Sequence, residues 1–484
     1  MCPPSATTRP QFTILWTISI CLAVIGVTCL AAMIFPPLAV LATGAACIGL
    51  LVLRTPQHAN LLVVFALFSN IAIVAVRFHG VPKIAAAAYP LLLVIPLLEK
   101  VLVRRERLRI DAITIWLLLF LAVQLVGASF SRDPAFSLLE VQKFALEGLL
   151  LYILLFNTVR TEDELRRASW ALVVAGAVVG FFPILQQLTG TFHHNYGGFG
   201  QTVAEDSFSI GGHSQLRLCG SIGEKNRFSQ NMLMFAPIAW WLSQGVQDRR
   251  VKLFGIGCAV IAVLAFALAF SRGSAIAAVL TVGILFLLRV VSAGQLLKIA
   301  IAGVAVLLVL PQYGARLTSI GHLSSMVGGR PKNSAEALDG SFRRRAEVMV
   351  AAGLVYLDHP VIGVGPGMSR FYSREYGNQL GLRKVKTDRQ SHNMVLALAA
   401  ETGTLGLICF GGLIATLLVR LQQMRRRWLK TRPALAFLAT GYLAALLLYL
   451  TTGLFLHMAY IRFFYLIVVL AGATLAVGAA LERS

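Results

Sequence analysis

Long apolar segments recur along the chain from residue 12 to the C-terminus. Most are close to the roughly 20 residues that an α-helix needs to cross the hydrocarbon core of a bilayer. Charged or Gly/Pro-containing breaks separate them into about 14 predicted transmembrane helices, or about 12 if the weakest segments are discounted. The segments begin near residues 12, 37, 60, 82, 111, 141, 167, 227, 253, 273, 296, 392, 434 and 459. The pattern predicts an all-α, polytopic integral membrane protein.

Composition agrees with this fold class. The 484 residues are 57% hydrophobic and 13% charged, so a soluble globular protein is a poor interpretation. The net charge of +22 does not by itself indicate a nucleic-acid partner, because basic residues on cytoplasmic loops orient membrane helices. We therefore expect no nucleic-acid partner. The first apolar segment, 12–34, is longer than the core of a signal peptide and lacks a clear small-residue cleavage site, so we expect it to be a retained helix.

Basic clusters predict the orientation of the helices. With the N-terminus in the cytoplasm, counting helices places these basic residues on cytoplasmic loops: Arg104, Arg105, Arg107, Arg109, Arg160, Arg166, Arg167, Arg249, Arg250, Lys252, Arg420, Arg425, Arg426, Arg427, Lys430 and Arg432. An excess of lysine and arginine on cytoplasmic loops is the rule for inner-membrane proteins. The same count puts the C-terminus in the cytoplasm and two long loops on the outer face.

The two outer loops divide the chain into five parts. These are N-terminal transmembrane helices in 1–188, a first outer loop in 189–226, central transmembrane helices in 227–311, a larger second outer loop in 312–391, and C-terminal transmembrane helices in 392–484. The second loop contains an amphipathic helical pattern over 342–358, which we expect to lie along the membrane surface. Both loops are basic although long translocated loops escape the positive-inside rule, and binding of an anionic, phosphorylated substrate is one explanation.

Four groups of polar residues fall on the predicted outer face. In chain order they are Arg217-Leu-Cys-Gly220 with Lys225-Asn226, Ser271-Arg272-Gly273, His359-Pro360 with Gly363-Val-Gly365-Pro-Gly367, and Ser391-His392-Asn393. In this order, on one face of a many-helix membrane protein, they resemble the loop motifs of the bacterial O-antigen ligase and O-antigen polymerase superfamily. The resemblance extends over roughly residues 217–406, and the N-terminal helices match only in hydropathy.

Two arginines are the first candidates for chemistry. Arg272 sits at the outer junction of two apolar segments, where a guanidinium is costly unless it is paired or faces a polar cavity. The resemblance implies that Arg217 and Arg272 hold the pyrophosphate of an undecaprenyl-linked glycan donor and stabilise charge on the departing lipid pyrophosphate. A guanidinium suits this role because it is permanently charged and can donate two parallel hydrogen bonds to phosphate oxygens. The structural alternatives are a snorkelling interfacial arginine for Arg272 and a solvated loop charge for Arg217.

His392 is the candidate general base. It stands just before the apolar segment that begins near Met394, at the predicted membrane surface. A neutral imidazole there can take a proton from a sugar hydroxyl. The resemblance implies this role, with the activated hydroxyl attacking the anomeric carbon in a single displacement that inverts it. On spacing alone, a histidine at this position is more often a cap or a surface group.

Further substrate-binding candidates flank these motifs. Asn226 and Asn393 stand where outer loops enter helices, so they either cap those helices or hydrogen-bond the donor. Lys225 and Ser271 adjoin the candidate arginines. The run Arg343-Arg344-Arg345 resembles the family's arginine upstream of the His-Pro motif, and either one of the three faces the donor or the run is a solvated basic face.

Two other features are interpreted structurally. The glycines at 363, 365 and 367 follow no predicted strand, so they are not a dinucleotide-binding fingerprint and are expected to shape the backbone. Glu401 falls about two and a half turns into its predicted helix. We expect this carboxyl to be partly buried and paired rather than catalytic.

Metals and cofactors are not expected. The outer loops contain no acidic pair of the DxD type, which a metal-dependent nucleotide-sugar transferase would need. We therefore predict a metal-independent reaction, because arginines can stabilise a pyrophosphate leaving group. The resemblance implies an undecaprenyl-pyrophosphate-linked glycan donor and a lipid A core or glycan acceptor. We also expect contact with membrane lipids and a monomer. The resemblance also implies the bacterial inner membrane, with the active site on the periplasmic face.

The expected function is glycosyl transfer, most specifically O-antigen ligation to lipid A core. A polysaccharide polymerase would use the same donor chemistry with the end of another glycan as acceptor, and a protein hydroxyl is a third acceptor. A transporter of polysaccharide or lipid-linked oligosaccharide is the alternative from another class. Transporters usually carry internal repeats and midplane ion sites, whereas the polar motifs here lie in the outer loops. A non-catalytic partner in envelope assembly is the third class.

Overall fold

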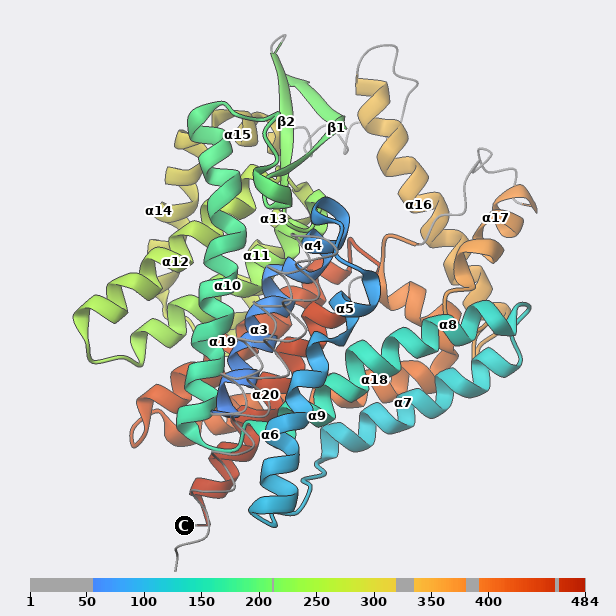
Figure 1. Cartoon of the computed structure of the whole chain (residues 1–484). Helices are drawn as coiled ribbons and strands as arrows, with labels where there is room; N and C mark the ends of the chain where they lie inside the picture. The colour runs from blue at the N-terminus through green and yellow to red at the C-terminus, as the bar shows by residue number, and fades with distance from the viewer. Residues whose placement is uncertain (1–54, 211–212, 319–334, 380–390, 458–460, 484) are drawn as a thin grey trace, which may run out of the picture.

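The structure, a computed structural model, describes residues 55–210, 213–318, 335–379, 391–457 and 461–483. The predicted transmembrane segments that begin near residues 12 and 37 lie outside these ranges. Within them, the ordered elements are helices apart from one two-stranded hairpin (Figure 1). The all-α class is therefore confirmed. The hairpin is an addition that the hydropathy pattern did not predict.

The N-terminal part of the described chain is a series of helices with short connections. It comprises α3 (Gln57–Ser69), α4 (Ile71–His79), α5 (Lys83–Ala88), the 3-10 helix η1 (Tyr89–Leu93), α6 (Val94–Leu98), the π-helix η2 (Glu99–Val103), α7 (Ala112–Ser129), α8 (Pro134–Phe144), the π-helix η3 (Ala145–Leu150), α9 (Leu151–Thr158) and α10 (Glu162–Thr189). Side-chain caps fix where the long helices begin. Asp111 accepts from the backbone N–H of Thr114 (2.8 Å), and Thr161 accepts from that of Glu164 (3.2 Å).

The first predicted outer loop is partly a β-hairpin. After the 3-10 helix η4 (Tyr196–Gly198), strands β1 (Gln201–Ile210) and β2 (His213–Gly220) pair antiparallel, with Val203 opposite Arg217. The central helices follow: α11 (Lys225–Gln244), α12 (Arg249–Leu268), α13 (Arg272–Leu287), α14 (Ala293–Val309) and α15 (Pro311–Thr318). The C-terminal part consists of α16 (Ala335–Asp358), α17 (Ser369–Gln379), α18 (Met394–Trp428), α19 (Pro433–Gly453) and α20 (Ile461–Leu481). The amphipathic pattern predicted over 342–358 is thus part of the longer helix α16.

Seven helical segments in the described ranges are long and apolar enough to cross a membrane: Lys83–Val103, α7, α10, α12, α18, α19 and α20. Helices α3 and α4 together make an eighth, although they are bent by 60°. The bend occurs at Asn70, which adopts a left-handed conformation with a φ of 61°. Helices α13 and α14 are apolar but shorter. Every segment predicted from residue 60 onward corresponds to helical structure.

Helices α19 and α20 form the centre of the bundle. Helix α19 packs against α11, α13, α18 and α20, and nearly all of its side chains are buried. Helix α18 packs against α7 and α19, while α10 packs against α3 and α12 (Figure 1). The outward faces of α7, α12 and α14 expose large apolar side chains, as expected for surfaces in contact with lipid.

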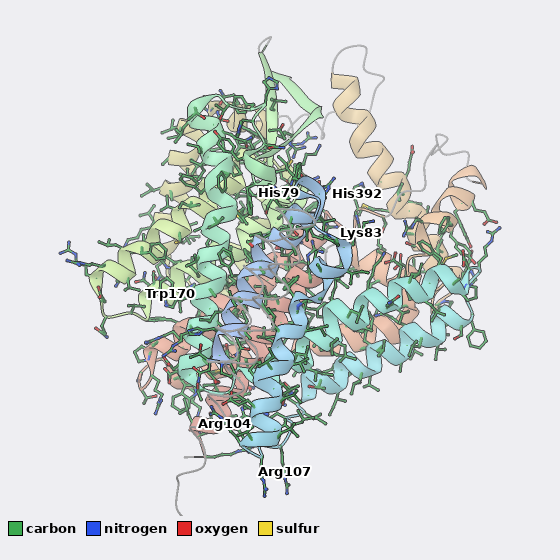
Figure 2. All side chains as sticks on the ribbon, in the orientation of Figure 1. His79, Lys83, Arg104, Arg107, Trp170 and His392 are labelled. Carbon is green, nitrogen blue, oxygen red and sulfur yellow. The ribbon has the colours of Figure 1, made fainter. Side chains whose placement is uncertain are left out.

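The bundle has two chemically different ends. We call the end that carries β1, β2, α15 and α16 the site end (Figure 1). The basic end lies opposite, where Figure 2 shows Arg104 and Arg107. Figure 2 also places His392 toward the site end, at the level of His79 and Lys83. The candidate base His392 therefore lies away from the basic end.

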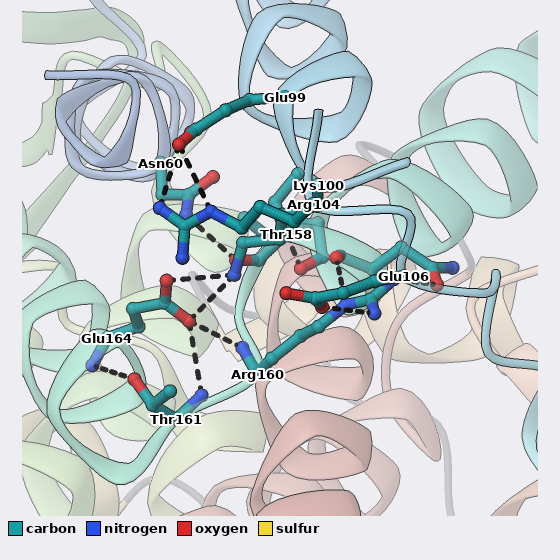
Figure 3. Close-up of polar contacts among 11 residues, drawn as sticks. Asn60, Glu99, Lys100, Arg104, Glu106, Thr158, Arg160, Thr161 and Glu164 are labelled. Atoms are coloured by element: carbon teal, nitrogen blue, oxygen red, sulfur yellow. Dashed lines mark hydrogen bonds and ion pairs between the residues drawn. The ribbon is translucent and has the colours of Figure 1, made fainter. Parts of the chain in front are cut away.

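A network of buried charged residues lies at the basic end (Figure 3). Lys100 Nζ lies 2.8 Å from Glu164 Oε1 and donates to the carbonyl oxygen of Thr158 at 2.8 Å. Arg160 Nη1 lies 2.6 Å from Glu106 Oε2, and its backbone N–H donates to Glu164 Oε2. The network ties η2 and the segment that follows it to the connection between α9 and α10. Since each of these charges is paired, we interpret the network as structural.

Candidate active site

Glu224 fixes the start of α11, which is the central element of the site. Its Oε1 accepts from the backbone N–H of Asn226 at 3.0 Å, and its Oε2 accepts from that of Arg227 at 2.7 Å. A carboxylate in this position satisfies free amides and interacts favourably with the helix dipole. Asn226 is therefore not the cap that the sequence allowed. Its Nδ2 donates to Glu224 Oε1 at 3.1 Å, and its Oδ1 faces other partners.

Arg217 projects from β2 into the break between α12 and α13. Its Nε donates to the carbonyl oxygen of Ala269 at 2.9 Å, and its Nη2 donates to that of Phe270 at 3.3 Å. Nη2 also lies 3.4 Å from Asn226 Oδ1. Only 5% of Arg217 is exposed, so it is not a solvated loop charge. It holds the backbone that leads directly into the Ser271-Arg272-Gly273 motif.

Ser271 completes a polar junction with Asn226. The Ser271 hydroxyl donates to Asn226 Oδ1 at 3.1 Å, and Ser274 donates to Ser271 Oγ at 3.0 Å. Tyr313 on α15 donates to the Ser271 carbonyl oxygen at 3.2 Å. The next residue, Arg272, is half-buried and opens α13. Two motifs that lie about 50 residues apart in sequence thus share one amide oxygen.

The connection after α19 lies against the start of α13. A Cβ added to Gly273 would come within 2.9 Å of Phe455 Cβ, so the two backbones are in close contact. Two residues further along, the carbonyl oxygen of His457 accepts a hydrogen bond from the Arg227 guanidinium. Arg227 is 3% exposed and also donates to Gln230 at 3.1 Å. Gln230 in turn donates to Thr452 at 2.8 Å, which ties the end of α19 to α11.

His392 contacts the connection after α19 through His457. The imidazole rings of His392 and His457 lie 5.9 Å apart, centroid to centroid, at an angle of 67°. Asn393 caps α18, because its Oδ1 accepts from the backbone N–H groups of Val395 and Leu396 at 2.9 and 3.0 Å. The capping interpretation of Asn393 is thus confirmed. The cap fixes the backbone immediately after His392.

Burial and nearby cations lower the pKa of the His457 imidazole far below its usual range. The dominant cause is removal from water, and the nearby Arg227, His392 and Arg370 further disfavour a proton on the His457 ring. His457 is therefore neutral at physiological pH. A neutral imidazole has one nitrogen that donates a hydrogen bond and one that accepts.

The glycine-rich segment seals a break in α18. Gly403 has a φ of 62° and a ψ of −164°, which interrupts the helix. The loop supplies replacement partners: Val364 N–H donates to the Ala400 carbonyl oxygen (2.9 Å) and Gly365 N–H to that of Glu401 (3.1 Å). Gly363 also has a positive φ, and an added Cβ would come within 2.4 Å of the Glu401 carbonyl carbon. The expected backbone role of the glycines is confirmed.

Glu401 is paired, as expected. The Ser369 hydroxyl at the start of α17 donates to Glu401 Oε1 at 2.6 Å. Arg370, the next residue, donates to the Gly367 carbonyl oxygen at 3.1 Å and stacks over the Phe136 ring at 4.8 Å. The break in α18 and the start of α17 therefore form one packed unit.

A family model describes much of this unit. Residues 257–411 match the model of the O-antigen ligase family, over about a third of the chain. This segment of the chain is therefore similar to the O-antigen ligase family. A comparison with curated protein sequences finds no match. The family match confirms the resemblance seen in the loop motifs, and it supports a role in glycan ligation or polymerisation.

The O-antigen ligase match includes three of the four motifs. Arg272, the glycine-rich segment and His392 lie inside it, whereas Arg217, Asn226 and His457 lie outside. The Ser271 hydroxyl, inside the match, donates to Asn226, and the His392 ring, also inside it, lies 5.9 Å from the His457 ring, so two outside residues contact the matched region. The site therefore extends on both sides of the matched region.

The remaining candidates occupy different positions. Lys225 is the first residue of α11 and is 8% exposed. Arg343, Arg344 and Arg345 lie on α16 at the site end, and their side chains are outside the described part of the structure. Which of these three arginines faces a donor stays a prediction.

Five contributors to this site were not singled out in the sequence: Glu224, Arg227, Gln230, Tyr313 and His457. Glu224 and Arg227 directly flank the Lys225-Asn226 motif, and that proximity was an available signal. His457 lies between two apolar segments, where a polar residue near a predicted outer turn was a second signal. Gln230 and Tyr313 gave none, because their partners are distant in sequence.

Proposed function

We propose that this protein transfers a glycan from undecaprenyl pyrophosphate to an acceptor hydroxyl, with O-antigen ligation to lipid A core as the specific reaction. The observation that carries the proposal is the shared oxygen of Asn226, which links Arg217 to the Ser271-Arg272 motif. The contact between the His392 and His457 rings brings the fourth motif to the same end of the bundle. The O-antigen ligase match agrees with this chemistry.

Arg272 is proposed to bind the donor pyrophosphate directly. It opens α13, so the positive end of the helix dipole adds to its guanidinium charge. Arg217 is proposed to act mainly as a positioning residue, because three of its hydrogen bonds go to the protein. Its charge also favours an anion nearby. Fixed cations at a leaving group stabilise the transition state without reorganisation, and we propose that the reaction needs no metal ion.

His392 is proposed to remove the proton from the acceptor hydroxyl. The resulting oxygen attacks the anomeric carbon while the bond from that carbon to the pyrophosphate oxygen breaks, and its electron pair stays on the phosphate. One displacement of this kind inverts the anomeric centre. The Asn393 cap supports the role, because it fixes the backbone beside the base.

We propose that the site end faces the periplasm and that the basic end faces the cytoplasm. Figure 2 shows Arg104 and Arg107 at the basic end. Arg160 pairs with Glu106 beside Arg107, and Arg432 lies 3.3 Å from Glu162 at the start of α10, so these basic residues agree with the positive-inside rule. This orientation puts both termini in the cytoplasm and the protein in the bacterial inner membrane. It also gives the site access to a periplasmic acceptor.

One observation bears on the transporter alternative. The broken helix α18 resembles the discontinuous helices that bind ions in transporters. Here the glycine-rich loop supplies amides to the carbonyl oxygens of Ala400 and Glu401 at the break. These carbonyls are committed to the protein, which favours the enzyme over a transporter.

The test is a transfer assay with purified protein in lipid vesicles. Undecaprenyl-pyrophosphate glycan and lipid A core are supplied, and products are separated by mass. A glycan mass added to lipid A core supports ligation. Elongation of the donor glycan instead identifies a polymerase. Movement of intact donor across the vesicle bilayer, without either product, would refute the enzyme and identify a transporter.

A further inference from the structure

The connection between α19 and α20 carries His457, to which the proposed reaction assigns no role. His457 lies in a segment held from two sides: its carbonyl oxygen accepts from Arg227, and Phe455 lies against Gly273. Within the described part of the chain, its buried Nδ1 has no hydrogen-bond partner. Buried polar atoms are normally satisfied, so an open one beside a candidate base calls for an explanation.

The neighbouring imidazole of His392 offers an explanation for the open Nδ1 of His457. The His392 and His457 rings are 5.9 Å apart and inclined by 67°, so the edge of one ring faces the other. A small rotation of either side chain, or one bridging water, brings ring nitrogens within hydrogen-bond reach. Histidines that act as bases are commonly oriented by a second group that accepts a hydrogen bond from the ring.

The surroundings of His457 leave its imidazole able to accept a hydrogen bond. Burial keeps its imidazole neutral, and the charged and titratable groups around it are Arg227 on α11, Arg370 on α17 and His392 before α18. With cations on two sides, His457 does not compete with His392 for the proton. Its open nitrogen can therefore stay a hydrogen-bond acceptor while His392 becomes charged.

We propose that His457 is the positioning residue of His392. It accepts a hydrogen bond from the His392 imidazolium that forms when the proton leaves the acceptor hydroxyl, and it orients the ring before that step. The proton stays on His392, and His457 remains neutral. This inference rests on the proposed function, because it assumes that His392 is the base.

The test uses the full-length protein in lipid vesicles with undecaprenyl-pyrophosphate glycan and lipid A core. His457→Leu removes the acceptor, and His457→Asn keeps a hydrogen-bonding oxygen near the position of Nδ1. We expect His457→Leu to lower kcat at least about tenfold, with the KM for the donor changed less than about twofold. His457→Asn restores most of kcat. His58→Leu, at the start of α3 near the basic end, is the control and leaves both constants unchanged.

The pH profile separates positioning from a general packing effect. A hydrogen bond to the charged form of His392 raises its kinetic pKa, so its loss moves the acidic limb of kcat to lower pH in His457→Leu. The inference is overturned if wild type transfers glycan while His457→Leu keeps its kcat, or loses kcat with an unshifted acidic limb and no rescue in His457→Asn. If wild type transfers nothing, or His392→Ala is fully active, the proposed function fails and the inference falls with it.

Discussion

The Ser271 hydroxyl donates to Asn226 Oδ1 at 3.1 Å, across 45 positions of sequence. The same oxygen lies 3.4 Å from Arg217 Nη2. The side chain of Asn226, at the start of α11, therefore contacts both arginine-bearing motifs. We therefore expect the Asn226 Oδ1 atom to matter more for catalysis than neighbouring hydrogen-bonding atoms do.

Replacing Asn226 with alanine removes the shared acceptor. We expect kcat/KM for glycan transfer to fall roughly 10- to 100-fold, because a hydrogen bond to a charged group contributes about 1.5–3 kcal/mol. Ser274→Ala is the matched control, since Ser274 donates to Ser271 one bond further from Arg217. Its activity is expected to stay within about tenfold of wild type. Equal losses in the two variants would contradict the importance of the shared oxygen.

The break in α18 predicts a sharp difference between two glycines of that helix. Gly403→Ala places a Cβ within 2.3 Å of the Val361 carbonyl oxygen at a φ of 62°, so we expect it to lower the free energy of unfolding by roughly 2–4 kcal/mol. Gly411→Ala adds a methyl in open space and is expected to be neutral or slightly stabilising. Thermal unfolding in detergent measures both. A stable Gly403→Ala protein would show that the break does not exist in solution.

The charge network at the basic end predicts a stability effect without a direct catalytic one. Lys100→Ala leaves Glu164 buried without its cation, and we expect a loss of roughly 3–5 kcal/mol. Arg104→Ala removes a pair with Glu99 in which the arginine is 48% exposed, so its loss is expected to be at most about 1 kcal/mol. Adding Glu164→Gln to Lys100→Ala should recover part of the stability. No recovery would mean that the lost packing of Lys100, and not the buried charge, sets the cost.

The lowered pKa of His457 predicts how acid affects stability. Below the unfolded-state pKa of about 6.5 the unfolded chain takes up a proton that folded His457 excludes, so this group makes stability fall as pH falls. The slope approaches about 1.4 kcal/mol per pH unit. Unfolding midpoints at pH 7 and pH 5 are compared in wild type and His457→Asn. A smaller drop in the variant is expected, and an identical drop would show that His457 titrates normally.

Hydropathy alone predicted most of the fold. Apolar segments from residue 60 onward coincide with helices, because membrane spans must satisfy their own backbone hydrogen bonds. The β-hairpin escaped prediction, since its strands lack a sustained apolar alternation. The break at Gly403 also escaped, because its replacement partners come from the loop around Val364, about 40 residues earlier.

The sequence predicted the motifs of the candidate site but not the hydrogen bonds that connect them. Arg217, Ser271 and His392 were proposed as site residues from the sequence, and the structure brings their segments to one end of the bundle. The sequence did not indicate that Arg217 would be committed to backbone carbonyls, or that Glu224 and not Asn226 would cap α11. These depend on contacts between helices, which local spacing does not encode.

The most direct measurement is glycan transfer from undecaprenyl-pyrophosphate glycan to lipid A core in the presence of EDTA, with wild type, Arg272→Ala and His392→Ala. We expect wild type to form the product under chelation, and both variants to fold normally but to lose at least about 100-fold in rate. Wild-type activity that disappears with EDTA, or folded variants that keep full activity, would contradict the proposed mechanism.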